Sequence, residues 1–80
     1  MNIYEQIKED YSLKPAEAER VENTVKAKIQ QALKRKYRTK KNPEAFKVRN
    51  FFIHLIKLSI CFNIEIDPQK KTFNISYERV

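Results

Sequence analysis

The chain has no glycine among its 80 residues, and this absence restricts both its loops and its turns. Gly-rich loops hold nucleotide phosphates because glycine lets the backbone approach the ligand closely, so P-loop and dinucleotide-binding fingerprints are excluded. Glycine is also the usual residue at turn positions with a left-handed backbone. In this chain those positions are left to Asn or Asp.

Length and cysteine content limit how the fold can be stabilised. We expect residues 1–80 to form a single domain. A chain of this size buries only about 60–65% of the surface that its unfolded form exposes, so its core alone is marginal. Cys61 is the only cysteine, which excludes an internal disulfide, and Cys61 with the single His54 provides too few ligands for zinc. We therefore expect no metal and no cofactor. A homodimer is the expected source of extra stability, with a well-packed monomer as the alternative.

Apolar residues spaced three and four apart predict three helices. The first covers about residues 2–11, where Ile3 and Ile7 share one stripe. The second covers about residues 15–40, and Pro15 suits its first position because the proline ring fixes a helical backbone angle. The third covers about residues 43–58, and Asn42 and Pro43 provide its N-cap and its first residue.

The last part of the chain changes from a helical period to an alternating one. Apolar and polar residues alternate over about residues 61–67 and again over about residues 72–78, with a turn at Pro68 between them. This pattern predicts an antiparallel β-hairpin with one apolar face and one polar face. The expected fold class is thus α+β, with three helices followed by a C-terminal β-hairpin.

The predicted third helix is apolar on most of its sides, which indicates that it is buried on most of its sides. One of its faces would be available for a homodimer interface. That face consists of Phe46, Ile53, Ile56 and Ile60. The alternative is that the first two helices and the hairpin cover both faces within one chain.

The net charge of +7 is concentrated in the middle of the chain. Residues 1–22 carry three basic and six acidic side chains, residues 23–58 carry eleven basic and one acidic, and residues 59–80 carry three of each. The densest part runs from Lys34 to Lys41, where six of eight residues are basic. Such blocks are typical of proteins that bind nucleic acid, acidic membrane surfaces or acidic proteins.

A row of cations on one helical face can neutralise several phosphates of a duplex at once. We expect phosphate contacts from the residues of the basic run, supported by three lysines outside it. They are Lys34, Arg35, Lys36, Arg38, Lys40 and Lys41, with Lys26, Lys47 and Lys57. DNA is favoured over RNA because sequence-specific RNA binders usually display aromatic stacking platforms. The alternative is a solvated helix end that only keeps the protein soluble.

No residue pattern points to catalysis. Cys61 lies among apolar residues without a recognisable Cys/His/Asp spacing, and a chain of this size with no Gly-rich loop leaves little room for a concave site. We therefore do not expect an enzyme. The longest apolar stretch, residues 51–62, includes His54 and Lys57 and is too short for a membrane span, which needs about 20 apolar residues. We expect a cytoplasmic protein with no membrane partner.

The expected function is that of a small DNA-binding regulator or accessory factor. Lys, Ile and Asn together make up 27 of the 80 residues, and their A- and T-rich codons favour a bacterium or a mobile element as the source. A second function fits the same charge pattern. The chain could be an inhibitor or adaptor that docks its basic face on an acidic protein partner.

Overall fold

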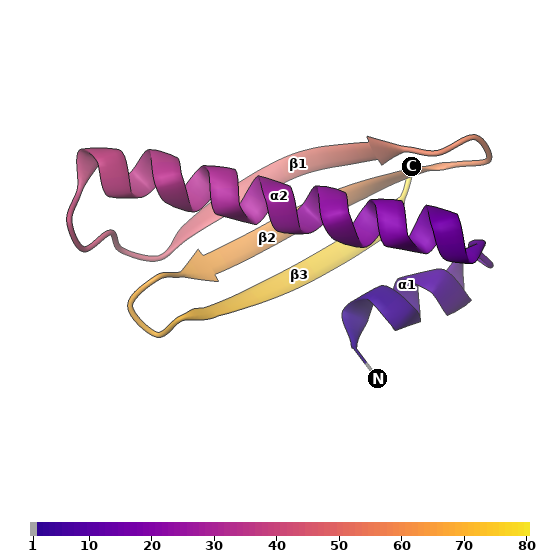
Figure 1. The fold of residues 1–80 in the computed structure, drawn as a ribbon, viewed down its shortest axis with the longest axis horizontal. Coiled ribbons are helices and arrows are strands. Elements are labelled where there is room, and N and C mark those ends of the chain that lie inside the picture. Colours follow the sequence, from indigo (N-terminus) through magenta and orange to yellow (C-terminus); the bar gives the residue numbers. More distant parts are fainter. Residues whose placement is uncertain (1) are drawn as a thin grey trace.

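The computed structural model describes residues 2–80, which form two helices followed by a three-stranded antiparallel sheet (Figure 1). The elements are α1 (Ile3–Asp10), α2 (Pro15–Thr39), β1 (Phe46–His54), β2 (Ser59–Asp67) and β3 (Thr72–Arg79). The strands lie in the order β1-β2-β3, so β2 is central. Both helices pack on one face of the sheet, and no element among residues 2–80 covers the other face. The fold is α+β.

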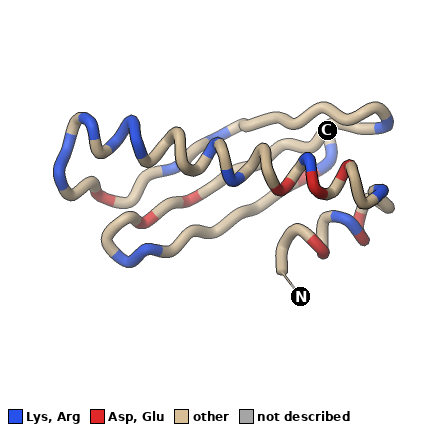
Figure 2. Tube along the Cα trace, viewed as in Figure 1, with Lys and Arg blue, Asp and Glu red and all other residues tan. Residues whose placement is uncertain are grey.

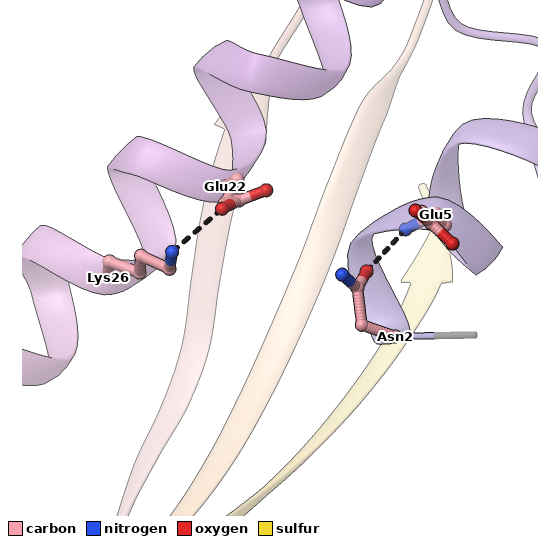
Figure 3. Close-up of polar contacts among 4 residues, drawn as sticks. All are labelled: Asn2, Glu5, Glu22 and Lys26. Carbon is pink, nitrogen blue, oxygen red and sulfur yellow. Dashed lines mark hydrogen bonds and ion pairs between the residues drawn. The ribbon is translucent and has the colours of Figure 1, made fainter.

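The two helices begin and end where local capping dictates, and both agree with their predicted ranges to within one residue. The side chain of Asn2 accepts a hydrogen bond of 2.9 Å from the Glu5 N–H at the start of α1 (Figure 3). At its end, the Leu13 N–H donates to the Lys8 carbonyl over 2.9 Å, which is the backbone pattern of a Schellman cap. Pro15 then opens α2.

The predicted third helix over residues 43–58 is wrong, because most of this segment is strand β1. A bulge between Val48 and Phe51 accounts for the error. Phe46 and Val48 alternate with polar residues, and after the bulge Phe51 and Ile53 resume the alternation on the same face. The extra residue adds a spacing of three to spacings of two, and this mixture imitates a helical period. Aromatic and β-branched side chains favour the strand instead.

The two predicted strands and the turn between them are present as β2 and β3, but they do not form a separate two-stranded hairpin, because β1 pairs with the other edge of β2. β2 begins two residues before the predicted first strand, and β3 ends one residue after the predicted second strand. Asp67 shapes the turn, because its side chain accepts hydrogen bonds from the N–H groups of Gln69 and Lys70 over 3.1 and 3.2 Å.

The core lies between α2 and the covered face of the sheet. Its most deeply buried side chains are Ile7, Val21, Val25, Ile60, Phe62 and Ile64. Three of them come from β2, which is therefore buried along most of its length. This packing fixes α2 across the sheet, with one flank facing β1.

Three of the four residues assigned to a dimer interface lie on the covered face of the sheet, where they pack within the chain, and the fourth lies in a turn. Ile53 and Ile60 belong to the core, and Phe46 is half-buried against it. Ile56 is 98% exposed in the turn between β1 and β2. A homodimer stays a prediction, and it needs another surface.

Candidate nucleic-acid interface

The basic block of the sequence lies on the C-terminal half of α2 and the turn that follows it (Figure 2). Residues 23–43 include eight basic side chains and no acidic one. The last acidic residue before them is Glu22. Its carboxylate forms an ion pair with Lys26, with 2.7 Å between Glu22 Oε2 and Lys26 Nζ (Figure 3). This is the only ion pair within residues 2–80, so the remaining cations of α2 carry no carboxylate partner there.

Two lysines of α2 are held on the flank that faces β1. The Lys28 ammonium lies 5.4 Å from the centroid of the Phe51 ring, and the Lys36 ammonium lies 5.1 Å from that of the Phe46 ring. Both rings come from β1, and both contacts are cation–π interactions. They orient two cations along the boundary between helix and sheet.

A cationic groove follows this boundary. It consists of two adjoining hollows of about 190 and 470 Å³, which share Lys28 and Gln31. We name it the α2–β1 groove, and its cations are Lys28, Lys34, Arg35, Lys36 and Lys47. None of its lining residues within the described chain is acidic. The groove is therefore suited to a ligand with several negative charges.

Of the nine predicted phosphate-binding residues, four line this groove and three more lie near one end of it. Lys34, Arg35, Lys36 and Lys47 line it. The other three residues of the basic run are exposed at the end of α2 and in the following turn, close to one end of the groove. They are Arg38, Lys40 and Lys41.

Two of the predicted residues lie elsewhere. Lys26 projects toward α1, where its ammonium lies 5.9 Å from the centroid of the Tyr4 ring. Its hydrogen bond to Glu22 raises the pKa of Lys26, so the side chain stays charged. That charge is already paired with a carboxylate. Lys57 lies in the β1–β2 turn, at the opposite end of the molecule from the basic end of α2 (Figure 1).

Lys28 was not among the predicted residues, although it lies in both hollows of the groove. The spacing of basic residues in the sequence could have identified Lys28. Lys28 precedes Arg35 by seven residues and Lys36 by eight, which is two helical turns and places the three side chains on one flank. Lys70 and Lys71 in the β2–β3 turn lie at the same end of the molecule as the basic end of α2 (Figure 2).

The uncovered face of the sheet is less suited to an anion. It includes a hollow of about 450 Å³ whose charged lining residues are Arg49, Glu65 and Lys47, so its charge is mixed. Lys47 lies on the edge strand β1 and borders both this hollow and the α2–β1 groove. Elsewhere on this face, His54 Nδ1 and Ser59 Oγ share a 2.7 Å hydrogen bond, and the Phe52 ring stacks on His54. Cys61 is a buried free thiol, as its apolar neighbours predicted.

Comparison of the chain with family models, with curated proteins and with solved structures gave no match. Neither α1 nor α2 combines the length and the apolar character that crossing a membrane requires. Residues 2–80 contain no group of three or more His, Cys, Asp or Glu side chains that could hold a metal ion.

Proposed function

We propose that this protein binds nucleic acid through the α2–β1 groove and the basic end of α2, and that it acts as a binding protein and not as an enzyme. The observation that carries the proposal is the composition of the groove, which has five cations and no carboxylate among its lining residues. A phosphate backbone is the polyanion that such a groove fits best, because each contacted phosphate releases bound counterions.

The spacing of the cations supports a duplex ligand. From Lys28 to Lys40 the helix extends roughly 18 Å at about 1.5 Å per residue. One strand of a duplex presents about five phosphates over that length, at about 3.4 Å each. Six basic residues of α2 and its C-cap lie within this span. They are Lys28, Lys34, Arg35, Lys36, Arg38 and Lys40.

Duplex DNA is favoured over single-stranded RNA by the state of the aromatic rings in the groove. Phe46 and Phe51 are half-buried, and Lys36 and Lys28 lie over them. Rings in this state offer no open face on which an unpaired base could stack. The role we propose is that of a small cytoplasmic regulator or accessory factor of a bacterium or mobile element.

An acidic protein is the second candidate partner, because the same charges would steer its association. The salt dependence of the binding affinity distinguishes duplex DNA from an acidic protein. Binding to duplex DNA weakens with a log–log slope of about −0.9 for each phosphate contacted, independent of base sequence.

The test is fluorescence anisotropy with mixed-sequence duplex DNA over a range of salt concentrations. We expect the wild type to bind with a slope of about −4 or steeper. The triple variant Lys28→Gln, Arg35→Gln, Lys36→Gln removes three groove cations. It should bind at least about tenfold more weakly, with a slope shallower by about two to three.

A matched control removes three cations outside the groove, by Lys8→Gln, Lys57→Gln and Arg79→Gln. Both variants have the same net charge, so a difference between them reports position and not total charge. If the two variants bind DNA equally well, the groove is not the binding site. If the wild type fails to bind DNA at low salt, the acidic protein partner becomes the better proposal.

A further inference from the structure

β3 is an edge strand that lacks the protection found on the other edge of the sheet. Natural edge strands avoid pairing with other chains through bulges, charged residues, prolines or a covering element. β1 has a bulge between Val48 and Phe51, and it carries Lys47 and Arg49. β3 pairs with β2 without interruption, and from Thr72 to Tyr77 it has neither a charged residue nor a proline.

The outer side of β3 presents backbone groups in a regular pattern. The Val80 N–H donates to the Ser59 carbonyl over 2.9 Å, which makes these two residues a hydrogen-bonded pair of the β2–β3 ladder. Such pairs alternate along an antiparallel ladder, so the even-numbered residues of β3 bond to β2. Phe73, Ile75 and Tyr77 therefore direct their N–H and C=O groups outward, where residues 2–80 provide no partner.

An apolar hollow of about 240 Å³ lies beside this edge, on the face that the helices cover. Its apolar lining comes from one side of α2 and from the β2–β3 hairpin, and consists of Ile29, Leu33, Tyr37, Ile66, Pro68 and Phe73. Phe73 is 51% exposed and Tyr37 is 49% exposed. A chain that paired with β3 would cover these side chains as well as the backbone edge.

The charges at the two ends of β3 are opposite. Acidic α1 lies beside the C-terminal half of the strand, where the Tyr77 hydroxyl donates to the Asp10 carboxylate (Figure 1). α1 also carries Glu5 and Glu9. The turn before β3 carries Lys70 and Lys71, beside the basic end of α2 (Figure 2).

We propose that β3 pairs antiparallel with β3 of a second copy of this chain. A two-fold axis reverses the second strand, so the acidic α1 of each copy meets the basic hairpin turn of its partner. The two sheets join into one of six strands, with both α2 helices on the same face. The interface combines backbone hydrogen bonds from Phe73, Ile75 and Tyr77 with burial of the apolar hollow and with complementary charge at both ends.

This dimer leaves the α2–β1 groove open. The groove lies on the β1 side of α2, and the proposed interface lies on the β3 side. Dimerisation does not rest on nucleic-acid binding, and it can be measured without nucleic acid.

The first test is sedimentation equilibrium of the full chain at micromolar concentrations, for the wild type and two single variants. Phe73→Lys places a charge on the β3 edge. Phe52→Lys is the matched control, because Phe52 is 45% exposed on the other edge strand. We expect the wild type and Phe52→Lys to be dimers, and Phe73→Lys to be a monomer with an unchanged far-UV circular dichroism spectrum.

Three results of this test would overturn the proposal. They are a monomeric wild type at hundreds of micromolar, a Phe73→Lys variant that dimerises as well as the wild type, and a dimer that only Phe52→Lys disrupts.

The second test is amide hydrogen exchange by NMR, which does not depend on a variant being folded. In the wild-type dimer we expect slow exchange at Phe73, Ile75 and Tyr77. Dilution to the monomer should make these three amides exchange fast, while Asn74 and Ser76 stay protected by β2. A dimer whose odd-numbered β3 amides exchange fast would show that the copies associate through another surface.

Discussion

Tyr77 links the last strand of the chain to the first helix. Its hydroxyl donates to the Asp10 carboxylate, and its ring meets that of Tyr11 edge-on at a centroid distance of 5.9 Å. Partial burial and the hydrogen bond to Asp10 raise the pKa of Tyr77 to about 12. A tyrosine held in its protonated form in this way makes stability depend on pH in the alkaline range.

The direction of this pH dependence follows from the pKa of Tyr77, which is 10.0 in the unfolded chain and about 12 in the folded chain. Below pH 10 the tyrosine is protonated in both the folded and the unfolded chain, so the full contribution of the contact is present. Between pH 10 and about pH 12 only the unfolded chain loses the proton, and stability falls. Urea unfolding across this range should show a steeper loss for the wild type than for Tyr77→Phe.

The control for this prediction is Tyr37→Phe, which removes an exposed hydroxyl that makes no hydrogen bond within residues 2–80. At neutral pH its stability should be close to that of the wild type, because no hydrogen bond is lost. A Tyr77→Phe variant with the same alkaline slope as the wild type would show that the Tyr77–Asp10 contact does not hold the proton in place.

At the level of elements, local signals predicted α1, α2 and the hairpin because each was uninterrupted. Pro15 marked the start of α2, and Pro68 marked the hairpin turn. The sequence did not reveal β1, because a strand is identified by strict alternation and the bulge at Asn50 breaks it. The bulge depends on the pairing of β1 with residues of β2 that are distant in sequence, which a local pattern does not contain.

The same limit applies to the candidate site. The basic run was visible in the sequence, but the groove that Lys34, Arg35 and Lys36 share with Lys47 exists only because β1 lies beside α2. Left-handed positions show a similar effect. We expected only Asn or Asp at these positions, and Asn50 agrees with that expectation. Ser12 and Lys71 do not, because the cap of α1 and the hairpin turn require positive φ angles at these two residues.

The bulge gives a prediction for β1. Asn50 has a φ of 54°, and its N–H donates to the Asn63 side chain over 3.1 Å. Asn50→Val should destabilise the fold by about 1–2 kcal/mol, because a β-branched residue is disfavoured at positive φ. Asn50→Gly should be close to neutral, since glycine adopts this angle without steric cost.

Chemical denaturation of both variants checks this prediction, with Asn74→Val as the control. Asn74 is exposed in β3 and has an ordinary strand backbone, so valine should be tolerated or slightly favourable there. An Asn50→Val variant as stable as Asn74→Val would show that residue 50 does not hold a left-handed conformation.

At the scale of the whole molecule, the proposed groove and the proposed dimer together determine how DNA would be bound. Charge is distributed along the molecule, with acidic residues near α1 and basic residues near the end of α2 (Figure 2). Pairing through β3 would place the two grooves near the outer edges of a six-stranded sheet. At about 4.8 Å per strand, the two β1 strands would lie roughly 24 Å apart. One duplex can bridge that separation.

Bivalent binding predicts that the dimer-disrupting variant loses affinity only for long DNA. On a duplex long enough to reach both grooves, Phe73→Lys should bind at least about tenfold more weakly than the wild type, because the second contact is no longer intramolecular. On a duplex that fills one groove, the two proteins should bind with similar affinity. The added lysine charge favours DNA binding, so a loss of affinity cannot come from electrostatics. Anisotropy with two duplex lengths measures both affinities. If Phe73→Lys binds long and short duplexes as the wild type does, each chain contacts DNA independently.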